Sequence, residues 1–446
     1  MIAVTLANPR HLKRANSTKA DLIEIRTDLY PESNIAGLIA KCEKPVILTI
    51  KSPRTVWLDY IDSPKVKYVD IDYRLTGLIK EFHKERSKRV KLIVSFHDYK
   101  ETPSWERIQK RLVQLQKLNP DVIKVATMIE EFDDISVIAR LQKKLGKKVI
   151  AVGMGDLGMM TRIYNRGLLT YARLSATDKQ TLENVSAAPG QLTVEQLKER
   201  KIFGLVGDAI KYSLSPLMYN NSFQHYDLPH IYQLWDTSKF STFKEVFNFF
   251  KLPGASVTQP FKTNALKMVD HADADSVKIG AVNTVVRDSD DKLIGYNTDW
   301  VGAEKALHGE LKDKKILILG AGGASAAVAY AAEKNGATKV TVLSRRDMPT
   351  DEDDFDVLVN ATPVYDTVLV PEDSLYSKVV MDCNYGTITE LVRHAEKKAR
   401  VVMDGLPMLL YQGEPQFKYW TGKKMPVEKI MTALKKHKKA KTGYGR

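Results

Sequence analysis

Cysteine and long apolar runs are scarce in this sequence. Only Cys42 and Cys383 occur, far apart and without neighbouring metal-ligand residues, which argues against both a disulfide framework and a zinc or other metal site. No window approaches about 18 consecutive apolar residues, so no membrane-spanning helix is predicted. The N-terminus places its apolar run before its charges, the reverse of a secretory signal. We therefore expect a cytoplasmic protein that does not bind membranes.

The residues that are present make an ordinary globular composition. Of 446 residues, 43% are hydrophobic and 27% charged, and this length predicts two or three domains. Lysine and arginine outnumber aspartate and glutamate, 68 to 54, which gives a formal net charge of +14. This excess favours anionic partners, whether nucleic acid or small carboxylates and phosphates. The oligomeric state is left open.

Eight short β-rich runs recur through roughly the first 180 residues. They begin near residues 2, 21, 44, 67, 91, 121, 147 and 168. Most are separated by stretches long enough for a helix, such as 105–118, where apolar residues recur at three-and-four spacing. Eight strands alternating with helices predict a compact (β/α)8 TIM barrel, whose functional residues would lie at the carboxyl ends of the strands.

Charged side chains interrupt or end these apolar runs. Glu24 and Arg26 share one face of the second run, His97 ends the fifth, Lys124 lies inside the sixth, and Arg162 follows a glycine-rich loop. Desolvation and neighbouring cations are expected to lower the pKa of Lys124 and leave a nucleophilic amine, as imine formation with a carbonyl requires. His97 would move protons, and the two arginines would bind a carboxylate. Each residue alone is more often structural, so their joint placement carries the argument.

The motifs EIRTD, SFHDY, VIKVAT, GMGDLGMMTR and APGQLT follow one another in this half. Together they resemble the type I 3-dehydroquinate dehydratases over residues 1–200. The resemblance implies that Lys124 forms a Schiff base with 3-dehydroquinate, without a cofactor, while His97 relays protons as water leaves to give 3-dehydroshikimate. The substrate-binding residues that it implies are Glu24, Arg26, Lys51, Arg162, Ser186 and Gln191.

Two positions depart from that family pattern. Lys51 stands where the family usually has arginine, and no Glu-Gly-Gly loop follows it. The serine expected four residues before Gln191, in the lid, is Ala187, with Ser186 one position earlier. We expect altered substrate contacts at both places, whereas Lys124 and His97 are unaffected.

A second αβ region begins near Ile202. Farther along, a strand, the turn GAGGA, an alanine-rich helix and a second strand predict a dinucleotide-binding fold, with backbone N–H groups close to a pyrophosphate. The second strand ends in Ser344, Arg345 and Arg346, where an acidic residue would select a free ribose hydroxyl. Two arginines favour a 2′-phosphate, hence NADP over NAD. The turn residues in this prediction are Gly320, Ala321, Gly322, Gly323 and Ala324.

Polar residues near the start of this region form a second candidate site. YSLSP carries Ser213 and Ser215, SVTQPFK carries Lys262, and GYNTDW carries Asp299. A lysine and an aspartate on neighbouring loops can act together on the proton of an alcohol or ketone, while serine hydroxyls bind a carboxylate. Taken alone, each residue is more often a turn or surface residue.

YSLSP, SVTQPFK, GAVNT, NTD, GAGGA, NATP, MDCNYGTITEL and MLLYQGEPQFKYWTG occur in this order. They resemble shikimate dehydrogenase from about Ile202 onward, which implies NADP(H)-dependent interconversion of 3-dehydroshikimate and shikimate. Lys262 and Asp299 would be the catalytic pair, and Ala361 and Thr362 would contact the cofactor. The implied substrate-binding residues are Ser213, Ser215, Thr258, Asn283, Tyr385 and Gln412.

This second match also has departures. Tyr212, Ser256 and Trp300 stand where the family usually has histidine, asparagine and glycine. We expect the bulky indole of Trp300, beside Asp299, to alter affinity or substrate preference. The SRR ending keeps positive charge where the family usually has Asn-Arg-Thr, and the ratio of NADP to NAD use stays open.

Together the halves resemble fused enzymes that carry both activities. The predicted architecture is a TIM barrel at 1–200, a substrate lobe at 202–305 completed by 408–446, and a Rossmann-like NADP lobe at 306–407. Two alternatives remain: a preference for quinate, since quinate and shikimate dehydrogenases share these motifs, and a quinate-responsive regulator without activity. The presence of all four catalytic candidates and the lack of a zinc-finger or clear helix-turn-helix pattern favour an enzyme acting on small molecules rather than a nucleic-acid partner.

Overall fold

The computed structural model describes residues 1–51, 58–61, 63–174, 192–344, 347, 354–376 and 378–442. The chain divides into two compact units. The first contains Met1–Lys201 and Ser241–Lys251, and the second contains Ile202–Phe240 and Leu252–Arg446. Within the described ranges, none of the helices has the length and apolar character needed to cross a membrane.

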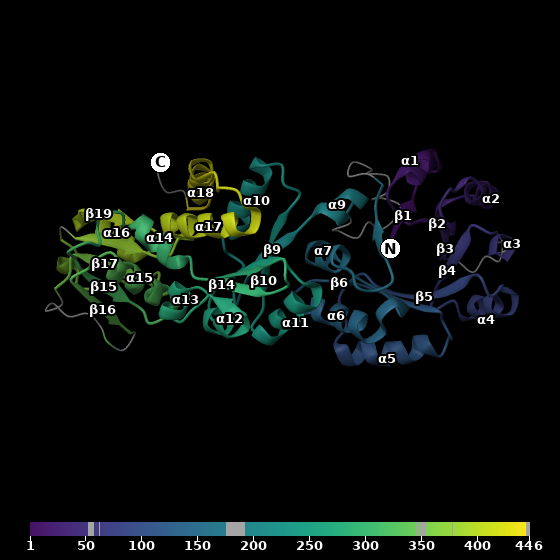
Figure 1. Cartoon of the computed structure of the whole chain (residues 1–446), viewed down its shortest axis with the longest axis horizontal. Coiled ribbons are helices and arrows are strands. Elements are labelled where there is room, and N and C mark those ends of the chain that lie inside the picture. Colours follow the sequence, from purple (N-terminus) through teal and green to yellow (C-terminus); the bar gives the residue numbers. More distant parts are fainter. Residues whose placement is uncertain are drawn as a thin grey trace. The chain divides into compact units, whose positions relative to one another are not determined.

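Eight parallel strands form the sheet of the first unit, in the order β7-β6-β5-β4-β3-β2-β1-β8 (Figure 1). The backbone N–H of Leu168 donates to the carbonyl of Val149 at 2.7 Å, which joins the two end strands and nearly closes the ring. The predicted (β/α)8 barrel is confirmed. Its strands are β1 (Ile2–Leu6), β2 (Leu22–Arg26), β3 (Val46–Ile50), β4 (Val66–Asp72), β5 (Lys91–Asp98), β6 (Val122–Met128), β7 (Val149–Met154) and β8 (Thr170–Ala172).

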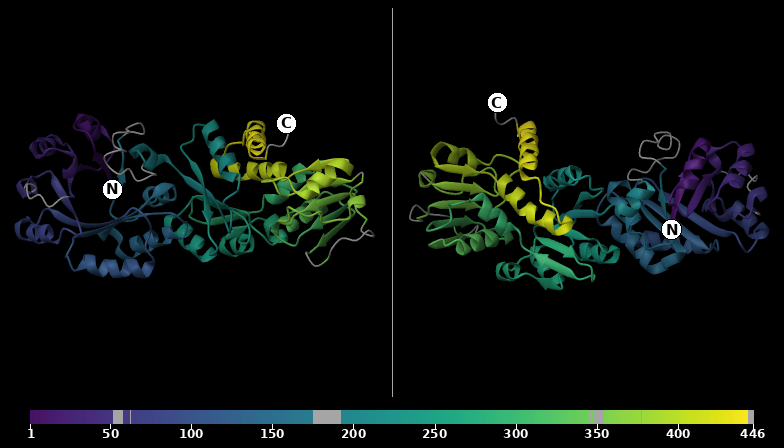
Figure 2. Two further views of the ribbon diagram at one scale, coloured as in Figure 1. Left: turned by 180° about the vertical axis from the view of Figure 1, so that it is seen from behind. Right: turned by 45° about the horizontal axis from the view of Figure 1, so that its top comes forward.

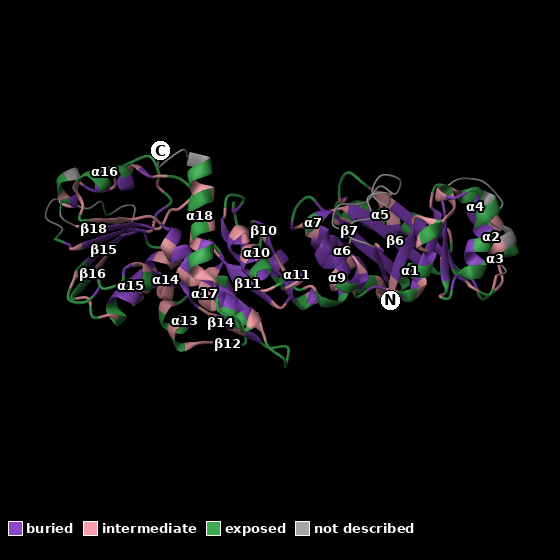
Figure 3. Cartoon of the chain, turned by 90° about the horizontal axis from the view of Figure 1, so that it is seen from above, coloured by how far each residue is buried: buried purple, intermediate pink, exposed green. Residues whose placement is uncertain are grey.

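Helices follow most of these strands and cover their outer face. In Figure 3 the strands are buried while the outward faces of the helices are exposed. At the start of helix α5 (Trp105–Gln116), the Ser104 side chain accepts a hydrogen bond from the N–H of Arg107. Along the same helix, the side chains of Ile108, Leu112 and Leu115 form one buried apolar stripe. The helices are α1 (Leu12–Ser17), α2 (Glu32–Lys41), α3 (Leu58–Ile61), α4 (Thr76–Glu85), α5 (Trp105–Gln116), α6 (Asp134–Leu145), α7 (Gly155–Ile163) and α9 (Val194–Glu199).

The interior of the barrel changes from apolar to polar along the strands. Because alternate residues of a strand face the same side, the inward positions can be followed two residues at a time. One layer is apolar and consists of Ala3, Leu22, Ile47, Tyr68, Ile93, Val122 and Ile150. Two residues farther along the same strands lie Thr5, Glu24, Thr49, Asp70, Ser95, Lys124 and Val152, all buried. Five of the seven residues of this mostly polar layer line the cavity described below, and Asp70 and Ser95 do not.

The second unit contains a mixed six-stranded sheet and a parallel five-stranded sheet. The first has the order β10-β9-β11-β13-β14-β12. Its strands are β9 (Ile202–Gly207), β10 (Ile231–Asp236), β11 (Gly254–Val257), β12 (His271–Ala272), β13 (Thr284–Arg287) and β14 (Leu293–Tyr296). The helices in this stretch of sequence are α10 (Ser215–His225), α11 (Phe240–Phe250), α12 (Lys262–Met268), α13 (Ala274–Ile279) and α14 (Asp299–Ala306). Most of α11 belongs to the first compact unit.

The five-stranded sheet has the order β16-β15-β17-β18-β19, so the strand order reverses between β15 and β17. Ligands of doubly wound sheets bind at such a switch point. The glycine turn follows β15 there, and Gly320 has φ +115, a conformation that favours glycine. The predicted Rossmann-like fold is confirmed. Its elements are β15 (Lys315–Leu319), α15 (Gly323–Lys334), β16 (Lys339–Leu343), β17 (Val357–Asn360), β18 (Val379–Asp382), α16 (Glu390–Lys398) and β19 (Val401–Met403).

The last two helices return to the six-stranded sheet. Helices α17 (Leu406–Thr421) and α18 (Val427–Thr442), yellow in Figure 2, share one apolar core with β9 and α10. Within it the rings of Phe203 and Trp420 stack with their centroids 5.1 Å apart. Segments about two hundred residues apart in the sequence therefore build one lobe.

Candidate active sites

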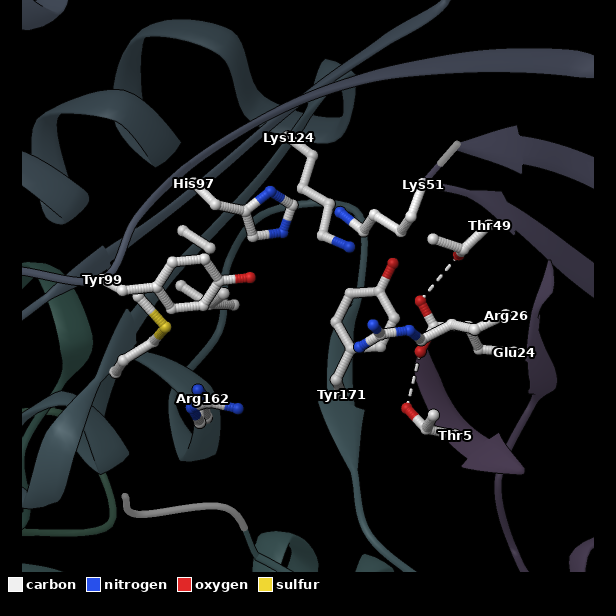
Figure 4. A pocket seen from close by; sticks show the side chains of 13 residues that line it. Thr5, Glu24, Arg26, Thr49, Lys51, His97, Tyr99, Lys124, Arg162 and Tyr171 are labelled. Carbon is white, nitrogen blue, oxygen red and sulfur yellow. Dashed lines mark hydrogen bonds between the residues drawn. The ribbon is translucent and has the colours of Figure 1, made fainter. Parts of the chain in front are cut away.

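A cavity of about 600 Å³ lies at the carboxyl ends of the barrel strands (Figure 4). Six of the eight residues predicted for the first half line it, whereas Ser186 and Gln191, together with the departure at Ala187, lie outside the described residues. This barrel cavity is lined by Thr5, Glu24, Arg26, Thr49, Lys51, His97, Tyr99, Lys124, Ala126, Val152, Met154, Arg162 and Tyr171. The predicted residues thus converge although they come from separate strands and a helix.

Lys124 is buried and paired. Its Nζ lies 2.8 Å from Asp70 Oδ2, with the side chains 7% and 0% exposed, and 4.3 Å from the centroid of the Tyr171 ring. Burial disfavours the ammonium, but Asp70 outweighs this cost and raises the pKa of Lys124 above that of an ordinary lysine. The expectation of a lowered pKa is therefore wrong, because it considered burial and cations but not the carboxylate on β4.

The same pair sets the ionisation of Asp70. Burial alone would raise its pKa, but Lys124 and Lys51 oppose burial and lower the pKa of Asp70 to about 2. Asp70 does not line the barrel cavity and lies behind Lys124. Asp70 is not among the residues predicted from the sequence, although the signal that singles out Lys124, a charge inside an apolar strand, is equally present in VKYVDID.

His97 is held neutral at pH 7. Burial lowers the pKa of His97 well below its ordinary value, and the nearby cations Lys124 and Lys51 lower it further. Its ring stacks on Tyr99 with the centroids 5.8 Å apart. A neutral imidazole in a cavity can accept a proton from a ligand, as general base catalysis requires.

Glu24 is held by two hydroxyl groups. Thr5 Oγ1 donates to Glu24 Oε2 at 2.6 Å, and Thr49 Oγ1 donates to Glu24 Oε1 at 2.8 Å (Figure 4). Both threonines come from strands that flank β2. The carboxylate is therefore fixed against the wall of the barrel.

Cationic groups dominate the rest of this cavity. Arg162 is 3% exposed, and its Nε donates to the carbonyl of Gly153 at 3.0 Å; no described carboxylate pairs with it. Burial lowers the pKa of Arg162 to about 10 and also lowers the pKa of Lys51. Arg26 makes two hydrogen bonds to Asp28, at 3.1 and 2.7 Å. Four lysine and arginine side chains against one glutamate in the lining favour a carboxylate ligand.

The second unit contains its own cavity, of about 730 Å³. It is lined by Leu205, Ser215, Ser256, Val257, Thr258, Lys262, Asn283, Asp299, Ala324, Cys383, Tyr385, Gly405, Met408, Leu409, Gln412 and Gln416. Every predicted catalytic and substrate residue of this half is in the lining except Ser213, whose Oγ lies 3.1 Å from Ser215 Oγ. This second cavity therefore gathers the motifs that the sequence spreads over two hundred residues.

Lys262 and Asp299 both face the second cavity. Lys262 Nζ lies 2.6 Å from Asp299 Oδ2, with the side chains 15% and 11% exposed. Asn283 Nδ2 donates to Asp299 Oδ1 at 2.8 Å and so fixes the other carboxylate oxygen. A ligand oxygen in the cavity can therefore exchange a proton with a preorganised pair.

Gln416 connects a buried polar network in the wall of this cavity. Its Oε1 accepts from Tyr219 at 2.7 Å and from Ser256 at 2.6 Å. Its Nε2 donates to Thr298 at 3.0 Å and to Gln412 at 2.7 Å. Gln416 is not among the residues predicted from the sequence, although its spacing of four residues from Gln412 places both on one face of α17.

Two of the unusual residues take up defined positions. Ser256 accepts from the hydroxyl of Tyr232 at 2.6 Å and belongs to the Gln416 network. Trp300 does not line the second cavity: its ring meets Tyr330 edge-on at 5.8 Å, and Lys334 Nζ lies 4.0 Å from its centroid. The indole thus packs against α15 instead of crowding a ligand.

The glycine turn offers room for a pyrophosphate. A Cβ on Gly322 would meet nothing within 4 Å, and the first N–H groups of α15 have no partner within the helix. A Cβ on Gly323 would lie 3.0 Å from Lys262 Cδ, and Ala324 lines the second cavity. The glycine turn therefore fits a dinucleotide beside the predicted substrate residues. It consists of Gly320, Ala321, Gly322, Gly323 and Ala324.

The remaining cofactor predictions are partly covered by the structure. Ser344 follows β16, and its hydroxyl donates to Asp347 at 2.7 Å. The backbone N–H and hydroxyl of Thr362, next to Ala361 after β17, donate to Asn360 Oδ1 at 3.0 and 2.7 Å. Arg345 and Arg346 lie outside the described residues.

Family models match both halves of the chain. The model of type I 3-dehydroquinase matches residues 5–200. The model of the shikimate dehydrogenase substrate binding domain matches residues 205–285, and that of the shikimate 5′-dehydrogenase C-terminal domain matches residues 405–435.

Individual relatives agree with these matches. The chain is 38% identical to the shikimate dehydrogenase (NADP(+)) of Pyrococcus furiosus, over 52% of this chain and 93% of that protein. It is 27% identical to the chloroplastic bifunctional 3-dehydroquinate dehydratase/shikimate dehydrogenase of Arabidopsis thaliana, over 95% of this chain and 81% of that one. A shikimate 5-dehydrogenase structure from Thermus thermophilus, in complex with shikimate, is 30% identical with a TM-score of 0.49, covering 53% of this chain and 99% of that chain. The chain therefore belongs to the shikimate dehydrogenase family and, with the type I 3-dehydroquinase that precedes that half, is a bifunctional 3-dehydroquinate dehydratase/shikimate dehydrogenase of the shikimate pathway.

Proposed function

We propose that the two cavities catalyse consecutive steps, with the barrel dehydrating 3-dehydroquinate and the second unit reducing the product to shikimate with NADPH. The observation that carries this assignment is that each cavity gathers the chemistry its step needs. A buried lysine beside a neutral histidine lines the first, and a lysine–aspartate pair beside a dinucleotide turn lines the second. We assign residues 1–200 to the dehydratase, 202–305 with 408–446 to the substrate lobe, and 306–407 to the NADP lobe.

In the barrel, Lys124 Nζ loses a proton and attacks the ketone carbon, and that proton later leaves with the carbinolamine hydroxyl as water. The resulting carbinolamine loses water to give an iminium, which acidifies the neighbouring carbon. His97, neutral before reaction, takes the proton from that carbon and returns it to the departing hydroxyl, so that water leaves. Hydrolysis of the iminium then frees 3-dehydroshikimate and Lys124. Arg162 binds the carboxylate, and Arg26, Lys51 and Glu24 hold the ring hydroxyls.

In the second unit, Lys262 and Asp299 supply the proton that the reduced oxygen needs. Bound NADPH supplies a hydride to the ketone carbon. Lys262 hydrogen-bonds the carbonyl oxygen and protonates it as negative charge develops, and Asp299 holds Lys262 in place. Asn283 fixes Asp299 and contacts a ring hydroxyl. The remaining substrate contacts are assigned to Ser213, Ser215, Thr258, Tyr385 and Gln412.

We assign the cofactor from the glycine turn after β15 and from the positive charge after β16. The GAGGA turn would hold the pyrophosphate at the N-terminus of α15, and Ala361 and Thr362 would border the nicotinamide end. Ser344, Arg345 and Arg346 would bind the 2′-phosphate and so favour NADP over NAD. We also retain the prediction of a cytoplasmic enzyme with small-molecule partners only.

Incubation of the whole chain with 3-dehydroquinate tests both steps. Without NADPH, we expect the ultraviolet absorbance of the enone product to rise. With NADPH, we expect NADPH absorbance to fall in proportion to the shikimate formed. Reduction of supplied 3-dehydroshikimate without any dehydration of 3-dehydroquinate would overturn the barrel assignment. Oxidation of quinate faster than shikimate, with NADP+, would overturn the substrate assignment of the second cavity.

A further inference from the structure

Lys124 has a different environment on each of its two sides. On one side it lines the barrel cavity, where a substrate ketone would arrive. On the other side its Nζ donates to Asp70 Oδ2 at 2.8 Å. Asp70 is 0% exposed and absent from the lining, so it cannot touch a ligand in the cavity. Its second oxygen, Oδ1, has no hydrogen-bond partner among the described residues, so the carboxylate is committed to Lys124 alone.

The other groups that face Lys124 are less suited than Asp70 to pair with its charged nitrogen. Glu24 on β2 is the nearest alternative anion, but both its oxygens already accept from threonine hydroxyls. Tyr171 on β8 offers its ring face and a phenol whose pKa is raised by burial, so it is uncharged at pH 7. The remaining neighbours are cationic or neutral: Lys51 at the end of β3, Arg26 on β2, His97 on β5 and Arg162 on α7.

We propose that Asp70 is the positioning counter-ion of the lysine adduct: it stays paired with the nitrogen of Lys124 as the ammonium becomes an iminium and aims the bound substrate carbon into the cavity. This inference rests on the proposed Schiff-base function of the barrel. It assigns a role to a residue that touches the reacting nitrogen from behind and never contacts the substrate.

The charge balance of the step fits a fixed carboxylate. An ammonium and a ketone combine to give an iminium and one water molecule, with one C=N bond formed and the C=O bond broken. One positive charge is present before and after, so a single buried anion at 2.8 Å neutralises both states. Without that anion, the buried iminium would be an uncompensated charge, which is costly in a desolvated site.

The geometry of the iminium gives Asp70 its positioning role. An ammonium has three N–H groups and can turn about its Cε–Nζ bond, but an iminium is planar and has only one N–H. If that N–H donates to Asp70, the substrate carbon must point away from Asp70, toward the side of Lys124 that lines the cavity. His97 lines the same cavity and can then reach the carbon next to the imine.

The test is the pH dependence of adduct trapping by cyanoborohydride. The whole chain is mixed with 3-dehydroquinate between about pH 6 and pH 10, and the adduct is followed by intact mass. In the wild type, trapping should still be rising at the top of this range, because Asp70 keeps Lys124 protonated. In Asp70→Asn, the midpoint should fall by about one pH unit or more, and dehydratase kcat should fall at least about tenfold with little change in KM. An unchanged midpoint overturns the proposal.

Asp72→Asn is the matched control. Asp72 lies two residues farther along β4, is also buried, and pairs with Arg74 at 2.8 Å instead of with Lys124. Its trapping curve should coincide with that of the wild type. An equal shift in both variants would mean that any carboxylate of the strand acts this way, which contradicts a specific counter-ion.

A further variant separates ionic pairing from folding. If Asp70→Asn does not keep the wild-type melting profile, Asp70→Glu decides, because it restores the charge one methylene away. Its midpoint should return to within about half a pH unit of the wild type while kcat stays low. A midpoint that stays low despite the restored charge overturns the proposal. Failure of the wild type to form any adduct would instead contradict the barrel function itself.

Discussion

Each of the two candidate sites has a lysine–aspartate pair, and the two pairs have nearly the same length but differ in how they are placed relative to the cavity. Lys124 and Asp70 are 2.8 Å apart, and only the lysine lines its cavity. Lys262 and Asp299 are 2.6 Å apart, and both line theirs. A hidden carboxylate can only hold its lysine, whereas an accessible one can share a proton with a ligand. Access to the ligand, more than pair distance, therefore distinguishes the nucleophile that we propose for the barrel from the acid–base couple that we propose for the second unit.

The surroundings of the pairs also differ. Cations predominate around Lys124, whereas Asp299 has, besides Lys262, the neutral amide of Asn283, which also donates to the Thr298 hydroxyl. Buried positive charge thus predominates in the barrel site, whereas hydrogen bonds order the second site. Substitutions in each site test this difference between the two pairs and their surroundings.

The largest expected effect comes from removing either lysine. Lys124→Ala should lower the dehydration rate by about 10⁴-fold or more and leave the reduction of 3-dehydroshikimate unchanged, since it removes the nucleophile. Lys262→Ala should lower reduction by about 10²- to 10⁴-fold and spare dehydration. Separate assays of the two steps measure this. Loss of both activities in either variant, with folding intact, would break the contrast between independent sites.

The next largest effect is expected from Gln416, whose replacement tests the hydrogen-bond network of the second site. Gln416→Ala should destabilise the second unit by about 3 kcal/mol, because it removes one buried hydrogen-bond partner each from Tyr219, Ser256 and Thr298. Urea unfolding followed by reductase activity measures the loss. Gln224→Ala, an exposed glutamine on α10, should change stability by less than about 0.5 kcal/mol. Equal effects of the two changes would show that the network does not stabilise this unit.

Arg162 tests the role of buried charge in the barrel. Burial lowers the pKa of Arg162 to about 10, so its buried charge opposes folding below that pH. This free-energy cost is relieved as the pH rises from about 10 toward the pKa that Arg162 has in the unfolded chain. Arg162→Met should therefore leave the melting temperature of the ligand-free barrel unchanged or higher. It should also lower dehydratase kcat/KM by about 10- to 100-fold by removing a carboxylate contact. A lower melting temperature with normal kcat/KM would make Arg162 structural.

The smallest effect concerns Trp300. Because its ring contacts Tyr330 and Lys334 outside the second cavity, Trp300→Leu should change the KM for shikimate by less than about threefold. It should cost about 1 kcal/mol of unfolding free energy through lost aromatic and cation–π contacts. Steady-state kinetics and thermal unfolding measure both quantities. A large change in KM would return Trp300 to the role that the sequence analysis expected.

The barrel could be predicted well because each strand is an apolar run ended by a charged or turn residue. Lys124 stood out for the same reason. Asp70 carries the same signal, but its pairing with Lys124 could not be predicted, because the two residues are 54 positions apart and meet only through the register of the barrel. The direction of the lysine pKa was wrong as a result, since that partner decides its sign.

In the second unit, motifs located the cavity, while the supporting network escaped prediction. The partners of Gln416 come from β11, α10 and the residue before α14, up to 197 residues away. The spacing of residues within a short stretch of sequence does not predict such contacts. Ser186, Gln191, Arg345 and Arg346 remain predictions, because they lie outside the described residues.

The return of α17 and α18 to the six-stranded sheet sets an order of events during protein synthesis. All eight barrel strands have been translated by residue 172, so the dehydratase cavity can form while the ribosome is still making the second unit. The second cavity has to wait for Gln412 and Gln416 on α17. Until then, the apolar face that β9 and α10 present to these helices is exposed, and the nascent chain is most vulnerable to aggregation in this interval.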